Sequence, residues 1–249
     1  MIYFLYEQND FVFCCLPGEQ GHPKGESLKT CVIGDIHGCH ASLQSLLEKV
    51  IDRADTLIFL GDYVDRGPDS RQVVETLIHL HNTHPQVIFL KGNHELMLEN
   101  YLTGTETSMF LRIGGRQTLD SYGIPLTADG NMLAMLPPSH VAFLESLTLL
   151  YEDQYGIYVH GGLQPGRHLS RQTPDWCLWV RDRFIRSSYN FGKPVIFGHT
   201  VFRTPLVEHN KIGIDTGAVY GGQLTALLLP DMEFIQVAGE QNHPFPGTL

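Results

Sequence analysis

A seven-residue loop, Gly61-Asp62-Tyr63-Val64-Asp65-Arg66-Gly67, carries two carboxylates and a guanidinium. The loop follows a strand-like apolar run that ends at Leu60. A strand that is apolar throughout is typical of a parallel sheet covered on both faces, and such sheets bind ligands at the carboxyl ends of their strands. Because carboxylates in this position can hold a metal ion or direct a proton transfer, we expect the loop to carry chemistry.

Two more loops have the same construction. Thr30–Ile33 leads into Gly34-Asp35-Ile36-His37-Gly38, and Val87–Leu90 leads into Lys91-Gly92-Asn93-His94-Glu95. Each combines a short apolar strand, a glycine, a pair of residues that can bind metal or transfer protons, and the start of a helix. If the three strand ends lie side by side, they bring together Asp35, His37, Asp62, Asp65, Asn93 and His94.

The order of these motifs resembles a known family. The set comprises Gly-Asp-Ile-His-Gly, Gly-Asp-Tyr-Val-Asp-Arg-Gly, Lys-Gly-Asn-His-Glu, His160-Gly161-Gly162 and Gly198-His199-Thr200. It resembles the phosphoprotein phosphatase (PPP) family of metallophosphoesterases, in the bacterial branch that is similar to the phage lambda protein phosphatase. The resemblance runs from about Lys29 to about Leu229. One motif alone is weak evidence, whereas five in this order are specific.

The resemblance implies an α/β chain with the calcineurin-like metallophosphoesterase fold, in which two packed β-sheets are flanked by helices. It also implies a centre for two divalent metal ions. Matching positions place Asp35 and His37 on one ion, Asp62 between both, and Asn93, His160 and His199 on the second. Mixed nitrogen and oxygen ligands without thiolate suit Mn, Fe or Zn better than Ca. Mn²⁺ is the ion that the resemblance favours, with Fe or Zn as alternatives.

The catalytic roles are also carried by the resemblance. A hydroxide bridging the two ions would attack phosphorus in line, His94 would protonate the leaving group as general acid, and Asp65 would orient His94. Arg66 would bind the phosphate oxygens. The remaining candidates for contacts with substrate are Arg181, with Arg183 as its local competitor, together with Tyr220 and Lys91.

The resemblance predicts a phosphomonoester hydrolase, foremost a serine/threonine protein phosphatase with phosphotyrosine as a further substrate. The partner would be a phosphoprotein or phosphopeptide. The alternative is a hydrolase of dinucleoside polyphosphates such as diadenosine tetraphosphate. The complete Asp65-Arg66-Gly67 and the Glu95 after Asn93-His94 favour the protein phosphatase, since bacterial dinucleotide hydrolases commonly differ there. Trp176 and Trp179 are interpreted as packing residues rather than substrate contacts.

Composition narrows the range of partners. The chain has 249 residues and a formal net charge of -10, which disfavours nucleic acid as a partner and also a nuclease of the wider superfamily. Five cysteines without a Cys-x-x-Cys pair indicate reduced thiols in a cytoplasmic protein. No apolar run is long enough to span a membrane. The oligomeric state is left open.

Glycine and proline divide the chain into segments. Residues 1–28 are predicted to be an N-terminal extension with a hairpin and a linker, and residues 29–249 the catalytic domain. Apolar periodicity predicts helices around residues 40–50, 71–81, 93–102 and 140–147. The glycine-rich segment of about 101–138 is predicted to be a small helical cap with short helices near 108–113 and 116–122. Further strands are expected at 149–152, 157–160, 195–197, 212–214, 224–229 and 233–237.

Overall fold

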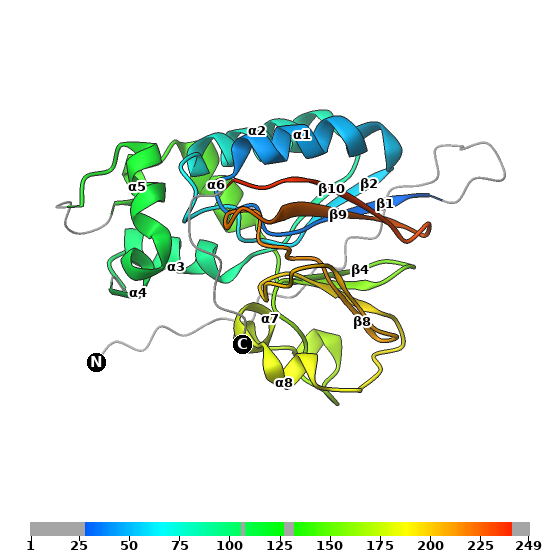
Figure 1. The fold of residues 1–249 in the computed structure, drawn as a ribbon. Coiled ribbons are helices and arrows are strands. Elements are labelled where there is room, and N and C mark those ends of the chain that lie inside the picture. Colours follow the sequence, from blue (N-terminus) through cyan, green and yellow to red (C-terminus); the bar gives the residue numbers. More distant parts are fainter. Residues whose placement is uncertain (1–27, 106–107, 127–131, 241–249) are drawn as a thin grey trace, which may run out of the picture.

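The computed structural model describes residues 28–105, 108–126 and 132–240. Two five-stranded sheets lie between layers of helices (Figure 1). The expected calcineurin-like arrangement of two packed sheets with flanking helices is therefore confirmed. The hairpin and linker expected within residues 1–28 lie almost wholly outside the described residues. The cysteines in the described part, Cys31, Cys39 and Cys177, are all buried.

The first sheet has the strand order β10-β9-β1-β2-β3. Its strands are β1 (Thr30–Ile33), β2 (Thr56–Phe59), β3 (Val87–Phe89), β9 (Gln223–Leu229) and β10 (Glu233–Ala238). β1, β2 and β3 are parallel, with Thr30 opposite Thr56 and Leu57 opposite Val87, whereas β9 is antiparallel to both of its neighbours, β1 and β10. The carboxyl ends of the three parallel strands therefore lie along one edge, as their loop sequences predict.

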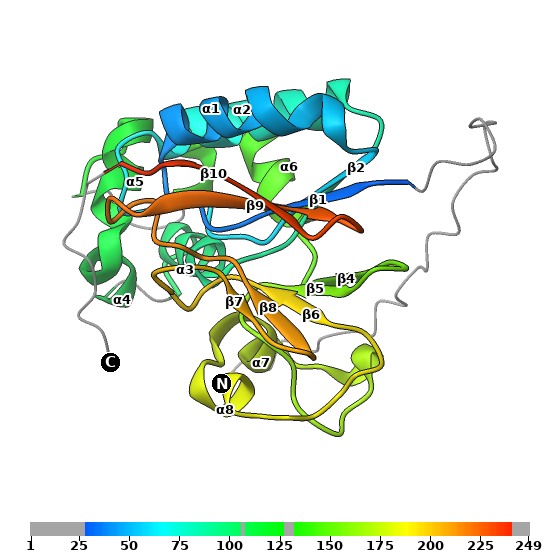
Figure 2. The same ribbon diagram turned by 45° about the vertical axis from the view of Figure 1, so that its right-hand side comes forward.

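The second sheet has the order β4-β5-β6-β8-β7 (Figure 2). Its strands are β4 (Leu150–Glu152), β5 (Ile157–Val159), β6 (Val195–Phe197), β7 (Leu206–Val207) and β8 (Lys211–Gly213). β5, β6 and β8 are parallel. β7 was not expected: it is a two-residue edge strand whose side chains are only partly buried, so it leaves no apolar pattern in the sequence.

Alternation of side chains divides the core into layers. In β1, Val32 faces the other sheet in a cluster with Ile58 and with Ile196 and Ile212 of the second sheet. Cys31 and Ile33 point the other way and pack against helices. β1 is buried on both sides because both faces of its sheet are covered. Each fully buried aliphatic side chain contributes about 1.5–3 kcal/mol to the stability of the fold.

Helices cover the outer faces. On the first sheet lie α1 (His40–Val50), α2 (Ser70–Thr83) and α6 (Pro138–Ser146). Against the second sheet pack α7 (Pro174–Trp179) and α8 (Asp182–Ile185), whose Cys177, Leu178 and Phe184 share a cluster with Val159 and Phe197 (Figure 2). Short 3-10 helices complete the connections: η1 (Ile51–Arg53), η3 (Leu133–Met135) and η4 (Leu169–Arg171).

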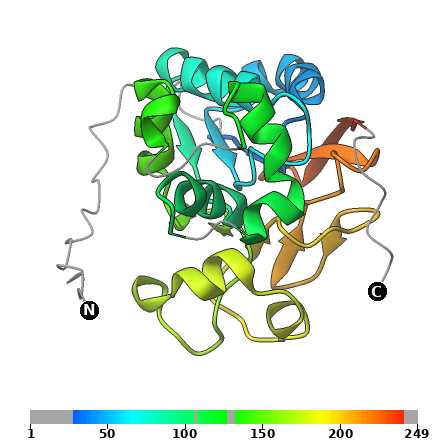
Figure 3. The same ribbon diagram turned by 90° about the vertical axis from the view of Figure 1, so that its left-hand side faces the viewer.

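The segment predicted as a cap contains helices at the expected places. After α3 (Asn93–Leu102) come α4 (Ser108–Phe110), the π-helical turn η2 (Leu111–Gly115) and α5 (Arg116–Tyr122). In Figure 3 these helices, in green, face the viewer. They touch the central loop directly, because the Arg66 amide donates a hydrogen bond to the Gly114 carbonyl oxygen.

No helix in the part of the chain that the structure describes combines the length and apolarity required to cross a membrane.

Candidate metal centre and active site

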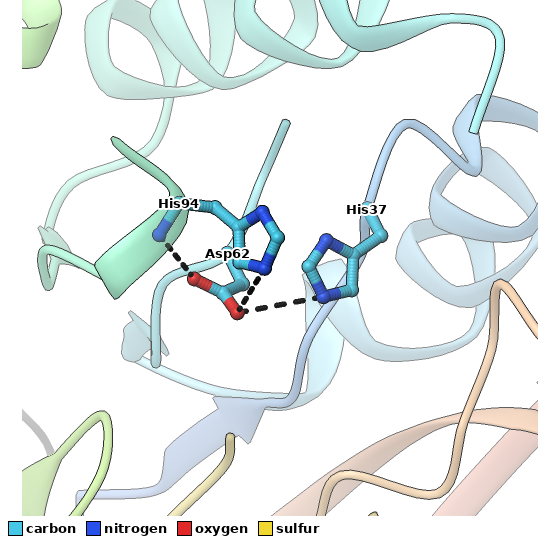
Figure 4. A group of neighbouring side chains, drawn as sticks. All are labelled: His37, Asp62 and His94. Carbon is cyan, nitrogen blue, oxygen red and sulfur yellow. Dashed lines mark hydrogen bonds and ion pairs between the residues drawn. The ribbon is translucent and has the colours of Figure 1, made fainter. Parts of the chain in front are cut away.

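Asp62 lies at the middle of a buried group of histidines drawn from both sheets. It follows β2, whereas His37 follows β1 and His94 is the second residue of α3 (Figure 4). The Asp62 Oδ2 atom is 3.4 Å from His37 Nε2 and 3.9 Å from His94 Nε2. The other oxygen, Oδ1, accepts a hydrogen bond from the His94 amide at 3.1 Å.

The second sheet completes the group. His160 follows β5, and its Nε2 atom is 3.3 Å from Asp62 Oδ1 and 3.0 Å from Asn93 Oδ1. His199 follows β6 and packs edge-on against His160, with ring centroids 5.0 Å apart. Ligand atoms therefore gather in two groups that share one carboxylate: His37, Asp62 and His94, and Asp62, His160 and His199. The two oxygens of Asp62 face different groups.

The tautomers of two histidines leave lone pairs directed at Asp62. His37 Nδ1 lies 2.8 Å from the Val64 carbonyl oxygen and His160 Nδ1 lies 3.0 Å from the Leu60 carbonyl oxygen, so each Nδ1–H donates to a backbone acceptor. In a neutral imidazole the Nε2 atom then carries a lone pair facing a carboxylate oxygen, which is unfavourable unless a proton or a cation lies between them. The residues present therefore fit divalent cations that accept nitrogen and oxygen ligands.

Electrostatics agree with this interpretation. Burial alone would raise the pKa of Asp62, but the charges of His160, His94 and His37 hold that pKa well below its usual range. Burial opposes charging of His160, and Asp62 overcomes it and raises the pKa of His160 to about 9. Burial, followed by the neighbouring positive charges, lowers the pKa of His37 and of His199 well below the usual value, which keeps both imidazoles neutral and able to bind a metal.

Asp35 and Asn93 were expected as ligands, and each contacts one of the histidines: Asn93 Oδ1 lies 3.0 Å from His160 Nε2, and Asp35 lies against the His199 amide. Asp35 is buried and both its oxygens accept a hydrogen bond from the His199 amide, at 3.2 and 3.0 Å. Burial and the charge of Asp215 raise the pKa of Asp35 well above its usual value. In the described structure the first ligand group contains His94 where the sequence assignment has Asp35.

His94 forms a dyad with Asp65. Its Nδ1 atom lies 2.7 Å from Asp65 Oδ2, and both side chains are almost completely buried. Asp65 Oδ1 accepts a second hydrogen bond, at 2.6 Å, from the Thr118 hydroxyl of α5. The carboxylate therefore fixes the tautomer of His94 and directs its Nε2 atom toward the histidine group, where a proton can be given or taken.

Two arginines reach the same place. Arg66 donates from its guanidinium to the Nε2 atoms of both His37 and His94, the latter at 2.8 Å, and its guanidinium carbon lies 5.6 Å from the centre of the Tyr220 ring. Arg181 donates from Nε to His199 Nε2 at 3.1 Å. Lys91 instead forms an ion pair with Glu99 at 2.8 Å, which reduces the charge it could offer a phosphate.

Glu95 holds the loops together. Its Oε2 atom accepts hydrogen bonds from the amides of Asp62 and Gly92, both at 2.9 Å, and Oε1 accepts from Tyr63 at 2.8 Å and Val64 at 3.3 Å. A fully buried carboxylate thus satisfies four backbone donors of the β2 loop and the α3 start. Burial, then the charge of Asp62, raises the pKa of Glu95 to about 7.

The site backbone is strained. Among the described residues other than glycine, positive φ angles occur at His37 (49°), Asp62 (53°), Asp65 (72°), Arg66 (69°), His199 (63°) and, outside the site, Met232 (54°). Side chains adopt this left-handed region at a cost, and such residues concentrate at functional sites. Gly92 is required here for another reason, because a Cβ atom at that position would overlap the Asp62 carboxylate.

Sequence reasoning missed several supporting residues. Thr118 and Ser70 hydroxyls both accept from the Asp65 amide, at 2.8 and 3.1 Å, yet Thr118 is 53 positions away in the chain and carries no local signal. Asp215 could have been found, because it follows β8 in the same strand-then-aspartate pattern as Asp35. It is buried, and burial raises its pKa to about 6.

Comparison with known proteins shows the family of this chain. The model of the calcineurin-like phosphoesterases matches residues 28–209. The chain belongs to this family. Its members use divalent metal ions, in agreement with the histidine and aspartate groups around Asp62.

One relative and two solved structures are informative. The asymmetrical bis(5′-nucleosyl)-tetraphosphatase PrpE of Halalkalibacterium halodurans is 29% identical over 235 residues, covering 84% of this chain and 94% of the relative. The crystal structure of a proposed diadenosine tetraphosphatase has a TM-score of 0.67 and 26% identity, covering 85% of this chain and 94% of that one. A cold-active protein-tyrosine phosphatase of a Shewanella species, at 18% identity and a TM-score of 0.62, covers 87% of this chain and 79% of that one and shares the fold.

These comparisons overturn the expected serine/threonine protein phosphatase and its phosphoprotein partner. PrpE and the proposed diadenosine tetraphosphatase are both named for dinucleoside tetraphosphates, and membership of the protein phosphatase branch is not supported. The structure explains why the reasoning failed. Asp65 holds His94 and Glu95 holds backbone amides, so these residues serve the phosphoryl site itself and carry no information about the group attached to it.

Proposed function

We propose that this chain hydrolyses bis(5′-nucleosyl) tetraphosphates asymmetrically, giving a nucleoside triphosphate and a nucleoside monophosphate. The observation that carries the proposal is the similarity to PrpE, which extends over 84% of this chain and 94% of that protein. The structure of the proposed diadenosine tetraphosphatase, with a TM-score of 0.67, supports the same substrate class. A phosphoric anhydride bond would be broken and one water consumed.

The metal ligands in this proposal are Asp35, His37, Asp62, Asn93, His160 and His199, and the first of the two ligand groups also contains His94. Two divalent cations, with Mn²⁺ as the first candidate, would supply charge neutralisation and an acidified water when bound. Asp62 is the residue suited to contact both, since its two oxygens face different imidazoles at 3.4 and 3.3 Å.

The chain's own groups have separate tasks. Asp65 holds the Nδ1–H of His94, which leaves Nε2 as the atom that gives a proton to the departing phosphate. Arg66 offers two guanidinium nitrogens at the same place, so it can bind phosphate oxygens when it leaves the imidazoles. Arg181 is the second phosphate-binding candidate, and Tyr220 supports the Arg66 guanidinium from one side.

The test compares kcat/KM on diadenosine tetraphosphate with kcat/KM on phosphoserine and phosphothreonine peptides, using Mn²⁺-loaded protein. We expect at least a tenfold preference for the dinucleotide, equivalent to about 1.4 kcal/mol in transition-state binding. Chromatography of the products should show ATP and AMP in equal amounts. A preference for the peptides would refute the substrate class, and two molecules of ADP would refute the asymmetrical cleavage.

A further inference from the structure

A pocket of about 260 Å³ lies where α7 meets α8, beside the histidine group. The side chains that give it its chemical character are Asp175, Trp176, Trp179, Arg181, Asp182 and Arg183. Whole small-molecule sites commonly occupy about 300–1,000 Å³. The pocket is therefore too small for a dinucleotide and of a size for one end of it.

The pocket shares a wall with the phosphoryl site. Arg181 lines the pocket and donates from Nε to His199 Nε2 at 3.1 Å. The Gly161 amide, directly after His160, donates to the Cys177 carbonyl oxygen of α7 at 2.5 Å. A Cβ atom on Gly161 would lie 3.1 to 3.2 Å from the backbone of residues 177–179, so α7 is pressed against the loop that carries His160. Arg181 therefore lies at once in the pocket lining and against the histidine group.

Flat, delocalised groups form the lining. The Arg183 guanidinium lies over the Trp176 ring, 4.6 Å from its centre. Trp176 is buried in the apolar cluster between the second sheet and helices α7 and α8. Trp179 is partly exposed and packs against the apolar clusters of both sheets. Nucleobases stack on indole rings and on guanidinium planes, and Arg183 is fixed in position by Trp176.

The charges suit a nucleotide. Arg181 and Arg183 contribute two positive charges, and the Asp182 carboxylate is paired with Arg186 at 3.0 Å. Phosphates would follow the arginines, and a carboxylate such as Asp175 can accept hydrogen bonds from ribose hydroxyls or an exocyclic amine.

We propose that this pocket binds one nucleobase of the substrate, with the base lying against Trp179 and the Arg183 guanidinium while the phosphates reach the histidine group past Arg181. This subsite rests on the proposed dinucleotide substrate. It gives the Trp-Cys-Leu-Trp segment of α7 a part in choosing the substrate, beyond its packing role.

Binding can be measured apart from catalysis. The chain contains two tryptophans, and both line the pocket, so all indole fluorescence reports on it. ATP and inorganic tripolyphosphate, which lacks the nucleoside, are titrated into Mn²⁺-loaded protein. We expect ATP to bind about tenfold more tightly than tripolyphosphate and to change the tryptophan emission, whereas tripolyphosphate leaves the emission nearly unchanged.

Two matched variants locate the effect. Arg183→Ala should reduce the ATP preference to about twofold or less and raise the KM for diadenosine tetraphosphate about tenfold with little effect on kcat. Arg171→Ala removes the same charge from an exposed position at the end of η4, outside the pocket lining. It should retain the preference. Trp179→Phe, which keeps an aromatic face, should retain more of it than Trp179→Leu.

The outcomes separate the two proposals. Equal affinity of the wild-type protein for ATP and tripolyphosphate, or an unchanged preference in Arg183→Ala, would overturn the nucleobase subsite even if diadenosine tetraphosphate is hydrolysed. A strong ATP preference that Arg183→Ala abolishes, together with no hydrolysis of dinucleoside tetraphosphates, would support the subsite and refute the proposed function.

Discussion

Replacing Glu95 with glutamine tests whether one buried carboxylate organises the site. The change is nearly isosteric, but it converts one acceptor oxygen into an NH₂ donor. In the wild-type protein the two oxygens accept from the amides of Asp62, Tyr63, Val64 and Gly92. The glutamine oxygen can serve one pair of amides, so the other pair faces a donor.

The magnitude follows from those two unsatisfied donors. Each buried donor without a partner costs about 1–3 kcal/mol, so Glu95→Gln should lower the free energy of unfolding by about 2–6 kcal/mol. For a chain of this size, 1 kcal/mol shifts Tm by roughly 2–4 °C, and a loss near ~3 kcal/mol would lower it by about 6–12 °C. Since the Asp62 amide loses its anchor, we also expect weaker metal binding.

The assay is urea unfolding at pH 8, above the pKa of about 7 that burial gives Glu95, together with elemental analysis of the purified protein. Glu99→Gln is the matched control on the same helix, because Glu99 pairs with Lys91 near the surface rather than with backbone amides. That change should cost at most about 1 kcal/mol. If the free energy of unfolding of Glu95→Gln lies within about 0.5 kcal/mol of that of the control, and the variant keeps its metal, Glu95 does not hold the loops.

Three further predictions concern single side chains. Asp62→Asn should lose at least one equivalent of metal, because both its oxygens face imidazoles, and full metal content by elemental analysis would contradict the shared role. His94→Asn should slow hydrolysis of an alkyl phosphate by about 10²–10⁴-fold and of diadenosine tetraphosphate by far less, because the departing phosphate is a stable anion; equal slowing would show that His94 is not the proton donor. Burial lowers the pKa of His140, whose Nδ1 accepts from the Tyr122 hydroxyl at 2.8 Å. Because the unfolded chain then protonates His140 more readily than the folded protein does, the free energy of unfolding should fall as the pH decreases below the unfolded pKa of 6.5. His140→Gln should flatten that dependence between pH 6.5 and 5 in urea unfolding, and an unchanged slope would exclude His140 as its source.

Local sequence patterns predicted most of the framework. The loops after β1, β2 and β3 were assigned because an apolar strand followed by glycine and a carboxylate or histidine is a short-range signal. Parallel pairing then brings these loops to one edge. In the second sheet β5 and β6 are also parallel and are followed by His160 and His199, two residues that were assigned from the family resemblance.

Long-range support was not predictable in this way. The Thr118 hydroxyl reaches Asp65 because η2 and α5 fold over the loop, a contact that depends on tertiary packing between segments of no shared pattern. The two-residue strand β7 and the pocket at α7 and α8 are also products of packing. The substrate class was misjudged because the motif residues used to choose it, Asp65 and Glu95, contact His94 and backbone amides. They therefore carry no information about the group attached to the phosphate.

The left-handed backbone at His37, Asp62, Asp65, Arg66 and His199 means that folding and chemistry favour different sequences at the same positions. Glycine would relieve strain of order 1 kcal/mol or more at each, while removing a side chain to which we assign a part in the proposed reaction. Laboratory evolution for heat resistance alone would therefore lead toward stable, inert variants. Keeping all five side chains therefore lowers stability, and only activity at this site would offset that loss.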